Sequence, residues 1–490
     1  MGILIFFSAC KNKKEVEQPK VPNTPFVSLH ENSFYLDGKP FYPVAVNFLV
    51  SLQAGNGEVW PTSSINYFEG SKYEFVTKDS SLKELSRQME LIKDMGFNSV
   101  RMVGAGEVKS RPGDEFLTVQ AFVGNERDTT IVLNDSTAYS NYLNALEILV
   151  DIAGESGLKV VLLSSITPDS TKFENHLEKL VTHFKDNTSI MAFDLFNEPL
   201  YFDPKERTKP EVRAITSHWN QIVKKNSPNH LTTIGLTGIR EVFEWDPDIL
   251  DVDFISFHPY EYEKEQVRNE MYWYYKYVDK PWIIGETAIP ADGDSVSYES
   301  QAEFARKTMI QARDCNAKGY TWWQYKDVNW PKFHSSYMGV LNRTGTTLTS
   351  NGNRVSGTLK PVVKEFKNFQ PDSKKDSCLC FDNYYNYSES PQFRLIGNVV
   401  DDEGNPIEGA VVMAWSEDWL KLNHTITKKD GSFELKADFQ LNHWIASAIY
   451  YDMSKAYVQK EGAVTENGVS RISIGEVRLH KVDFKKPLQQ

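Results

Sequence analysis

The chain has 490 residues, of which 40% are hydrophobic and 24% are charged, a composition typical of a folded globular protein and not of a disordered chain. Its 54 basic and 66 acidic side chains give a net charge of −12, which argues against a nucleic-acid partner and against binding to an anionic membrane surface. This length exceeds one ordinary core and predicts a large domain with an accessory module.

The N-terminus carries a short apolar stretch, then one cysteine, then a charged segment. Residues 2–9 are apolar or small, Cys10 follows them, and Lys11 begins a segment rich in lysine and glutamate. This order resembles the end of a bacterial lipoprotein signal peptide, in which the cysteine becomes the lipidated first residue. The resemblance implies a signal segment at 1–10, lipidation of Cys10 and a tether at 11–26. The protein would then be an exported, membrane-anchored lipoprotein at the periplasmic face or outer cell surface; the alternative is a frayed apolar terminus.

Along residues 27–370, short apolar segments alternate with segments of helical periodicity. After a hairpin predicted around Asp37-Gly38, the apolar segments predict strands at 42–48, 98–103, 157–163, 190–196, 231–236, 254–257, 282–285 and 319–324. The intervening periodicity predicts helices at 81–95, around 142–150, and at 172–184, 211–224, 266–277, 299–317 and 357–368. Eight strands separated by helices predict an α/β fold, a (β/α)8 TIM barrel.

Polar and aromatic side chains stand at or just past the ends of several predicted strands. In a barrel the carboxyl ends of all strands meet at one face, so these residues are expected to share one pocket. Taken singly, each has a structural explanation, such as a salt bridge or a core filler, but their joint position at strand ends favours a site. The residues are Arg101, Asn197, Glu198, His258, Tyr260, Glu286, Trp322 and Trp323.

Two of these residues, Glu198 and Glu286, place one carboxylate at the end of the fourth and one at the end of the seventh strand. Two carboxyl groups that face each other can protonate a leaving group and attack a carbon. This is the chemistry of a retaining glycoside hydrolase, which needs no metal and no organic cofactor.

The ordered set of motifs resembles the (β/α)8 retaining glycosidase clan that contains glycoside hydrolase family 5, the cellulases and β-mannanases. The resemblance covers about residues 27–370 and rests on Gly96–Arg101, Asn197-Glu198-Pro199, His258-Pro259-Tyr260, Gly285-Glu286 and Trp322-Trp323. It implies that Glu198 is the acid/base and Glu286 the nucleophile in a double displacement. The implied substrate is a β-linked polysaccharide or oligosaccharide of mannan or glucan type. The alternative is a sugar-binding lipoprotein that retains the barrel without catalysis.

The remaining site residues have expected roles around this pair. Arg101 and Tyr260 would keep the pKa of Glu286 low, whereas Glu198 requires a raised pKa to carry a proton. Asn197 would donate to the sugar 2-hydroxyl, His258 would orient Glu198 or contact the substrate, and Trp323, with Trp322 beside it, would offer a stacking surface. Trp60, in a long aromatic segment after the first strand, either lines a sugar subsite or packs that segment.

Past a linker at 371–391, residues 392–490 alternate short strands and turns, which predicts a small all-β sandwich of immunoglobulin-like type. Gly397–Val400, Gly409–Val412 and Asp430–Phe433 resemble the carboxypeptidase-regulatory-like domain. Its tryptophans Trp415, Trp419 and Trp444 either bind carbohydrate or help the domain act as a packing module. No disulfide framework is predicted: Cys315 is interpreted as a core residue, and Cys378 and Cys380 lie in the linker. A monomer is expected.

Overall fold

Eight parallel strands close into a barrel in the computed structural model. They are β4 (Val44–Gly55), β6 (Ser99–Val103), β9 (Lys159–Leu163), β10 (Ile190–Asn197), β11 (Leu231–Leu236), β12 (Ile255–Phe257), β13 (Trp282–Ile284) and β14 (Tyr320–Trp322). Each strand pairs with the next in this order, and β14 pairs with β4. The predicted (β/α)8 barrel is confirmed.

The structure describes residues 23–484 apart from 112, 374, 382–387, 389 and 460–462. The predicted signal segment at 1–10, the lipidation site Cys10 and most of the tether at 11–26 lie outside the described residues. Within the described part of the chain, none of the helices combines the length and the apolar character that a membrane span requires.

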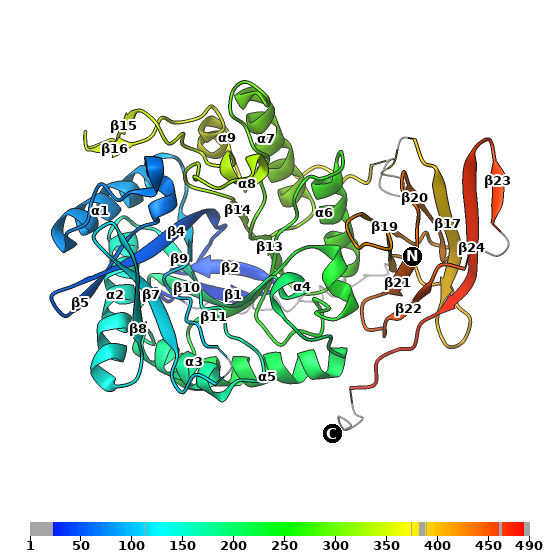
Figure 1. Cartoon of the computed structure of the whole chain (residues 1–490), viewed down its shortest axis with the longest axis horizontal. Coiled ribbons are helices and arrows are strands. Elements are labelled where there is room, and N and C mark those ends of the chain that lie inside the picture. Colours follow the sequence, from blue (N-terminus) through cyan, green and yellow to red (C-terminus); the bar gives the residue numbers. More distant parts are fainter. Residues whose placement is uncertain are drawn as a thin grey trace, which may run out of the picture.

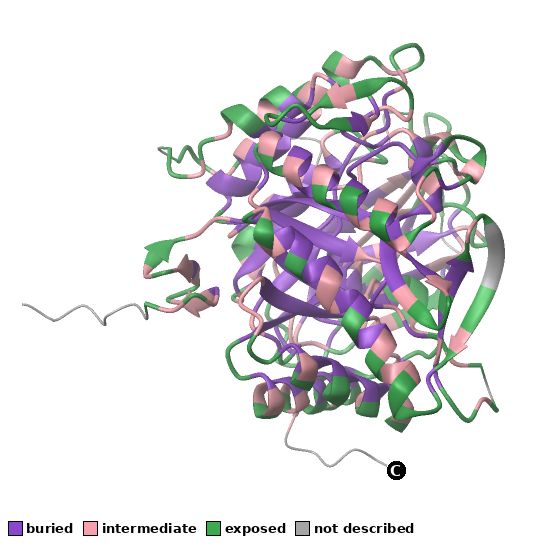
Figure 2. Cartoon of the chain, turned by 90° about the vertical axis from the view of Figure 1, so that its left-hand side faces the viewer, coloured by how far each residue is buried: buried purple, intermediate pink, exposed green. Residues whose placement is uncertain are grey.

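Helices surround the strands and turn their apolar faces inward, so that buried residues occupy the interior while the outer helix faces are exposed (Figure 2). Thr77 and Thr208 begin α1 and α5 with capping boxes, in which side chain and backbone exchange hydrogen bonds. The helices are α1 (Lys78–Asp94), α2 (Ser136–Glu155), α3 (Thr171–His183), α4 (Pro199–Phe202), α5 (Lys209–Asn226), α6 (Gln266–Tyr277), α7 (Tyr298–Asp314), α8 (Phe333–Ser336) and α9 (Val363–Asn368), with short 3-10 segments η1 (Ile65–Tyr67), η2 (Glu69–Ser71) and η3 (Ile239–Phe243).

A small sheet closes the amino-terminal end of the barrel. It consists of β1 (Ser28–His30), β2 (Ser33–Leu36) and β3 (Lys39–Pro40), which confirms the hairpin predicted at Asp37-Gly38. Its Val27 and Phe34 pack against residues near the starts of barrel strands, among them Val161 and Met191. The opposite end, where the strands finish, therefore remains for a site.

Two hairpins rise from that carboxyl end. β7 (Thr118–Val123) and β8 (Glu126–Val132) form the hairpin predicted there, whereas β5 (Glu58–Ser63), paired with an extended β4, was not predicted. The turn between β4 and β5 is Asn56-Gly57, both with positive φ, which is a favoured hairpin turn and a signal present in the sequence. A further hairpin pairs β15 (Thr346–Leu348) with β16 (Arg354–Ser356).

The C-terminal residues form two four-stranded sheets around a core of their own. One has the order β20 (Ser432–Ala437), β17 (Phe393–Val400), β24 (Val469–Arg478), β23 (Val464–Glu466); the other has β19 (Leu422–Ile426), β18 (Val411–Trp415), β21 (His443–Ser447), β22 (Ser454–Tyr457). The predicted β-sandwich is confirmed. Trp444 is 8% exposed and belongs to its core, so it cannot stack on a sugar, whereas Trp419 is 67% exposed.

The sandwich packs directly on the barrel beside α6 and α4 (Figure 1). Val411, Trp415, Ile426 and Ile445 of the sandwich join the hydrophobic cluster that fills the barrel domain. The buried Nζ of Lys209 bonds both Asp246 (2.9 Å) and the carbonyl oxygen of Ala448 in the sandwich (2.7 Å). The Trp273 Nε1–H donates to the Gly409 carbonyl oxygen at 2.8 Å. The interface therefore fixes the sandwich against the barrel.

The prediction for the cysteines was wrong: Cys315 and Cys378 form a disulfide. Cys315 follows α7, and the linker returns along this helix, where the Gln311 side chain donates to the Leu379 carbonyl oxygen at 2.8 Å. The bond spans a sequence separation of 63 residues. Closing a loop of this size stabilises a fold by about 4 kcal/mol in the chain-entropy model. Cys380 is free and exposed.

Candidate active site

The carboxyl end of the barrel gathers a connected network of polar side chains. Asn47 comes from β4, Arg101 from β6, and Asp194 and Asn197 from β10. The loops that follow β10, β12, β13 and β14 supply the rest: Glu198, His258, Tyr260, Glu286 and Trp323. The strand-end residues predicted from the sequence thus meet at one face, with the exception of Trp322.

Arg101 is the centre of the network and is 2% exposed. Its Nε donates to Asp194 Oδ2 at 2.8 Å, and its Nη1 donates to Asn47 Oδ1 at 2.9 Å and to Glu286 Oε1 at 2.6 Å. Its Nη2 donates to Asn197 Oδ1 at 2.8 Å. The carboxylates of Asp194 and Glu286 raise the pKa of Arg101 against the cost of burial, so the guanidinium stays charged.

Glu286 is held on both carboxylate oxygens. Arg101 bonds Oε1, and the hydroxyl group of Tyr260 donates to Oε2 at 2.8 Å. Burial raises the pKa of Glu286, while the charges of His258 and Arg101 and the Tyr260 hydrogen bond oppose that increase. Because a permanently charged guanidinium bonds this carboxylate directly, Glu286 is the glutamate of the pair better able to carry a negative charge.

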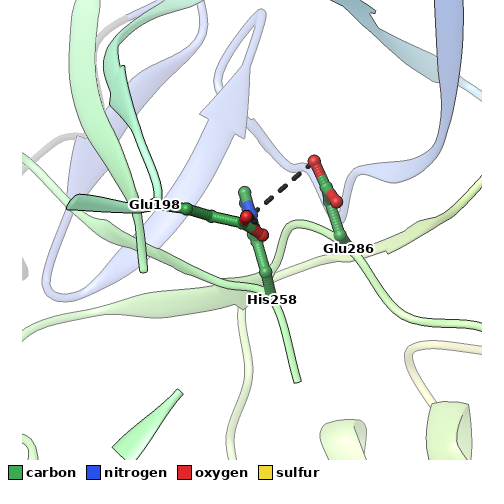
Figure 3. Close-up of side chains that lie close together, drawn as sticks. All are labelled: Glu198, His258 and Glu286. Atoms are coloured by element: carbon green, nitrogen blue, oxygen red, sulfur yellow. Dashed lines mark hydrogen bonds and ion pairs between the residues drawn. The ribbon is translucent and has the colours of Figure 1, made fainter. Parts of the chain in front are cut away.

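Glu198 has a different environment. Its only side-chain partner within hydrogen-bond distance among the described residues is His258, whose Nδ1 lies 3.1 Å from Oε1 (Figure 3). Burial raises the pKa of Glu198 to about 7, more than Arg101 and Arg240 lower it. Its backbone is left-handed (φ 49°, ψ 66°), and its N–H donates to the Gly235 carbonyl oxygen at 2.7 Å. A non-glycine residue in this region indicates local strain at a functional position.

His258 is buried and lies between the two glutamates, with Nδ1 3.6 Å from Glu286 Oε1 (Figure 3). Burial lowers the pKa of His258 to about 4, so the ring is neutral near pH 7. Glycines make room for it: a Cβ on Gly235 would lie 2.4 Å from its Cε1 atom, and one on Gly285 would lie 2.9 Å from its Nε2 atom. With Nδ1 protonated, the ring donates to Glu198, and Nε2 faces the Ser256 hydroxyl at 3.4 Å.

Atoms of Glu198, His258 and Glu286 that could bind a metal all lie within 4.8 Å of one another. A metal ion here would compete with the hydrogen bonds that both oxygens of Glu286 already accept. The charged Arg101 guanidinium, 2.6 Å from one of these oxygens, would also repel it. The arrangement therefore suits two reacting carboxyl groups better than a metal centre.

The three predicted tryptophans have different positions. Trp322 is fully buried, packs against Phe366 and Phe304 of the helix layer, and donates from Nε1 to the Met338 carbonyl oxygen at 2.9 Å, so its predicted contact with substrate is wrong. Trp323 is half-buried; its N–H donates to the Thr287 carbonyl oxygen, one residue past Glu286, and its peptide bond to Gln324 is cis.

Trp60 lies in β5 and is 7% exposed, and a Cβ on Gly55 across the hairpin would meet its ring at 3.1 Å. This burial favours its packing role over the sugar subsite.

The site also contains residues that the sequence analysis missed. Asn47 accepts from Arg101 and donates from Nδ2 to the carbonyl oxygens of Gly285 (3.0 Å) and Trp322 (3.2 Å). Asp194, fully buried, holds the opposite side of the guanidinium. A polar residue inside an otherwise apolar strand was the signal available for both.

The comparisons with known proteins agree with this geometry. Residues 65–329, more than half of the chain, match the family model "Cellulase (glycosyl hydrolase family 5)". No curated protein sequence matches the chain.

Solved structures similar to the chain include a glycoside hydrolase family 5 mannosidase from Rhizomucor miehei, with 14% identity over 71% of this chain and 97% of that one and a TM-score of 0.47. A β-D-glucuronidase from Dictyoglomus thermophilum has 14% identity over 70% and 52%, with a TM-score of 0.44. A β-glucuronidase from Ruminococcus gnavus has 14% identity over 70% and 51%, with a TM-score of 0.45. The chain spans about half the length of these two glucuronidases. On its family match, the chain belongs to glycoside hydrolase family 5 and is a glycosidase.

Proposed function

We propose that the chain is a retaining glycosidase that cleaves β-linked polysaccharides or oligosaccharides of mannan or glucan type, with Glu198 as acid/base and Glu286 as nucleophile. The observation that carries this proposal is the spacing and unequal environment of the two glutamates. Oxygens of both carboxyl groups lie within 4.8 Å of each other. Retaining glycosidases hold their carboxyl groups about 5–5.5 Å apart, whereas inverting enzymes need more room for a water molecule.

In the first step, a Glu286 oxygen attacks the anomeric carbon while the glycosidic C–O bond breaks. Glu198 gives its proton to the departing oxygen, and a covalent glycosyl-enzyme forms. In the second step, Glu198 takes a proton from water, whose oxygen displaces Glu286. Arg101 and Tyr260 orient the attacking carboxylate and stabilise its charge when it leaves.

Two further residues have proposed contacts with the sugar. The Oδ1 atom of Asn197 accepts from Arg101, which leaves its Nδ2 amide as the group that can donate to the sugar 2-hydroxyl. The half-buried Trp323 follows β14 close to Glu286 and offers a ring face for stacking.

The covalent intermediate provides the test of the mechanism. Incubation with 2,4-dinitrophenyl 2-deoxy-2-fluoro β-glycosides of cellobiose and mannobiose should inactivate the enzyme, because the fluorine slows the second step more than the activated leaving group slows the first. Mass spectrometry of a protease digest should find the fluorosugar on the peptide that contains Glu286. Hydrolysis that yields the α-anomer first, as seen by NMR, would contradict the retaining mechanism.

We also propose that the protein is exported and anchored through a lipid on Cys10. The Cys315–Cys378 disulfide supports export, because such bonds persist mainly in oxidising compartments. In a bacterial host, the full chain should incorporate labelled palmitate and sediment with membranes, and Cys10→Ser should lose both properties. Labelling that survives this substitution would refute lipidation at Cys10.

A further inference from the structure

We propose that the C-terminal sandwich forms one wall of the binding site for the leaving-group sugars, so that barrel and sandwich hold the oligosaccharide together. This inference rests on the proposed glycosidase mechanism. A cavity of about 480 Å³ lies between the two domains. Its walls include Tyr201, Arg240 and Tyr262 of the barrel and Leu420, Asp438 and Phe439 of the sandwich. This volume falls within the range of ordinary ligand sites, about 300–1,000 Å³.

The cavity adjoins the proposed acid. Tyr201 lies in α4, the short helix that begins directly after Glu198 and lies on the sandwich side of the barrel (Figure 1). Arg240 donates to the Tyr201 hydroxyl oxygen at 3.1 Å, and its charge lowers the pKa of Glu198. Tyr262 stands two residues past Tyr260, and the charge of Glu198 raises its pKa. Because the acid gives its proton to the departing oxygen, the leaving-group sugars must lie on the Glu198 side.

The chemistry of the walls fits a neutral sugar chain. Tyr201 is 58% exposed, Tyr262 is 72% exposed and Leu420 is 82% exposed, so large apolar surfaces gather around one cavity. Such a concentration of exposed apolar side chains is typical of a binding site. Aromatic faces stack on the C–H faces of pyranose rings.

Carboxylates complement these apolar surfaces. Glu263 of the barrel also lines the cavity, and burial together with the charge of Asp438 across the interface raises its pKa. Neither carboxylate forms an ion pair with any of the described residues. Carboxylates in this position can accept hydrogen bonds from sugar hydroxyl groups, which the stacking surfaces alone cannot bind.

The cavity is also rigid. The Oε1 atom of Gln266 accepts from the backbone N–H groups of Tyr262 (3.3 Å) and Glu263 (3.2 Å), which fixes the barrel rim. On the other side, the buried contacts of Lys209 with Asp246 and Ala448 fix the sandwich. A preformed cavity loses little conformational entropy on binding, so its contacts contribute more fully to affinity.

Two sandwich variants, Leu420→Ala and Asp438→Ala, provide the test. Both side chains are exposed, and Val464→Ala, an exposed aliphatic residue on β23 of the same domain, is the matched control. Each enzyme is assayed with cellotetraose, with mannotetraose and with the 2,4-dinitrophenyl β-glycosides of cellobiose and mannobiose, whose leaving group is a single ring.

We expect kcat/KM for the cleaved tetrasaccharide to fall about tenfold in both test variants, the effect of losing one good contact in a specificity pocket. The control should stay within about twofold, and the aryl glycoside should be hydrolysed at an unchanged rate by all three variants. If the tetrasaccharide values do not change, or if both substrates lose equally, the inference is overturned while the glycosidase mechanism stands. A wild-type chain that cleaves neither substrate class would overturn both.

Discussion

Glu286→Ala should lower kcat by about 10⁵-fold on any oligosaccharide that the wild-type chain cleaves, the order of loss found when one member of a catalytic unit is removed. The substitution deletes the group that attacks the anomeric carbon, and no other described carboxylate replaces it, because Asp194 is fully buried behind Arg101. The measurement is the steady-state rate of hydrolysis, compared with that of the wild-type chain.

A loss of folding would also abolish activity, so azide provides the control. The cavity left by the carboxylate can admit this anion, whose nitrogen attacks the anomeric carbon of a 2,4-dinitrophenyl β-glycoside and yields an α-glycosyl azide. Arg101 keeps Asp194, Asn47 and Asn197 as partners in the variant, so the pocket should persist. Activity within tenfold of wild type without azide would show that Glu286 is not the nucleophile.

The strand ends are the part of this molecule that sequence patterns predict well. Apolar runs that end in Asn197-Glu198 or Gly285-Glu286 give both the strand and the point where it meets the pocket, because parallel strands of a closed barrel all finish at one face. Local pattern and tertiary position coincide there, so the predicted cluster of Arg101, His258 and both glutamates is found in the structure.

The residues behind the cluster were harder to predict. Asp194 lies two positions before the strand end inside a buried run, and the sequence shows no partner for it. Only the closed barrel brings β6 beside β9 and β10, so that Arg101 reaches across to Asp194. Such contacts span about 90 residues of sequence and depend on tertiary packing.

Trp322 and Cys315 show two further limits. Neighbouring strand residues point to opposite faces, so one of Trp322 and Trp323 had to face the helices; the Tyr320 hydroxyl beside Thr308 of α7 shows that the even positions do. Cys315 and Cys378 form a bond because the linker returns along α7, and no cysteine spacing indicates that path.

Hydrolysis of oligosaccharides should decline above about pH 7, because Glu198 must hold a proton to protonate the leaving group. Burial raises the pKa of Glu198 to about 7, so the acid is protonated below this pH and loses its proton above it. His258 is not the source of this alkaline limb, since burial lowers its pKa to about 4. The acidic limb belongs to Glu286, which must be ionised to attack.

Glu198→Ala should remove the alkaline limb and lower kcat on oligosaccharides by about 10²–10⁴-fold, the usual contribution of a general acid. A 2,4-dinitrophenyl β-glycoside needs no protonation of its leaving group, so its first step should be almost unaffected and the glycosyl-enzyme should accumulate as a burst of dinitrophenolate. Both quantities come from kcat/KM profiles and pre-steady-state absorbance between pH 4 and about 9, within the range over which these carboxyl groups titrate. An alkaline limb that persists in Glu198→Ala would assign the proton to another residue, since the unequal environments of the two glutamates predict that only Glu198 carries it at neutral pH.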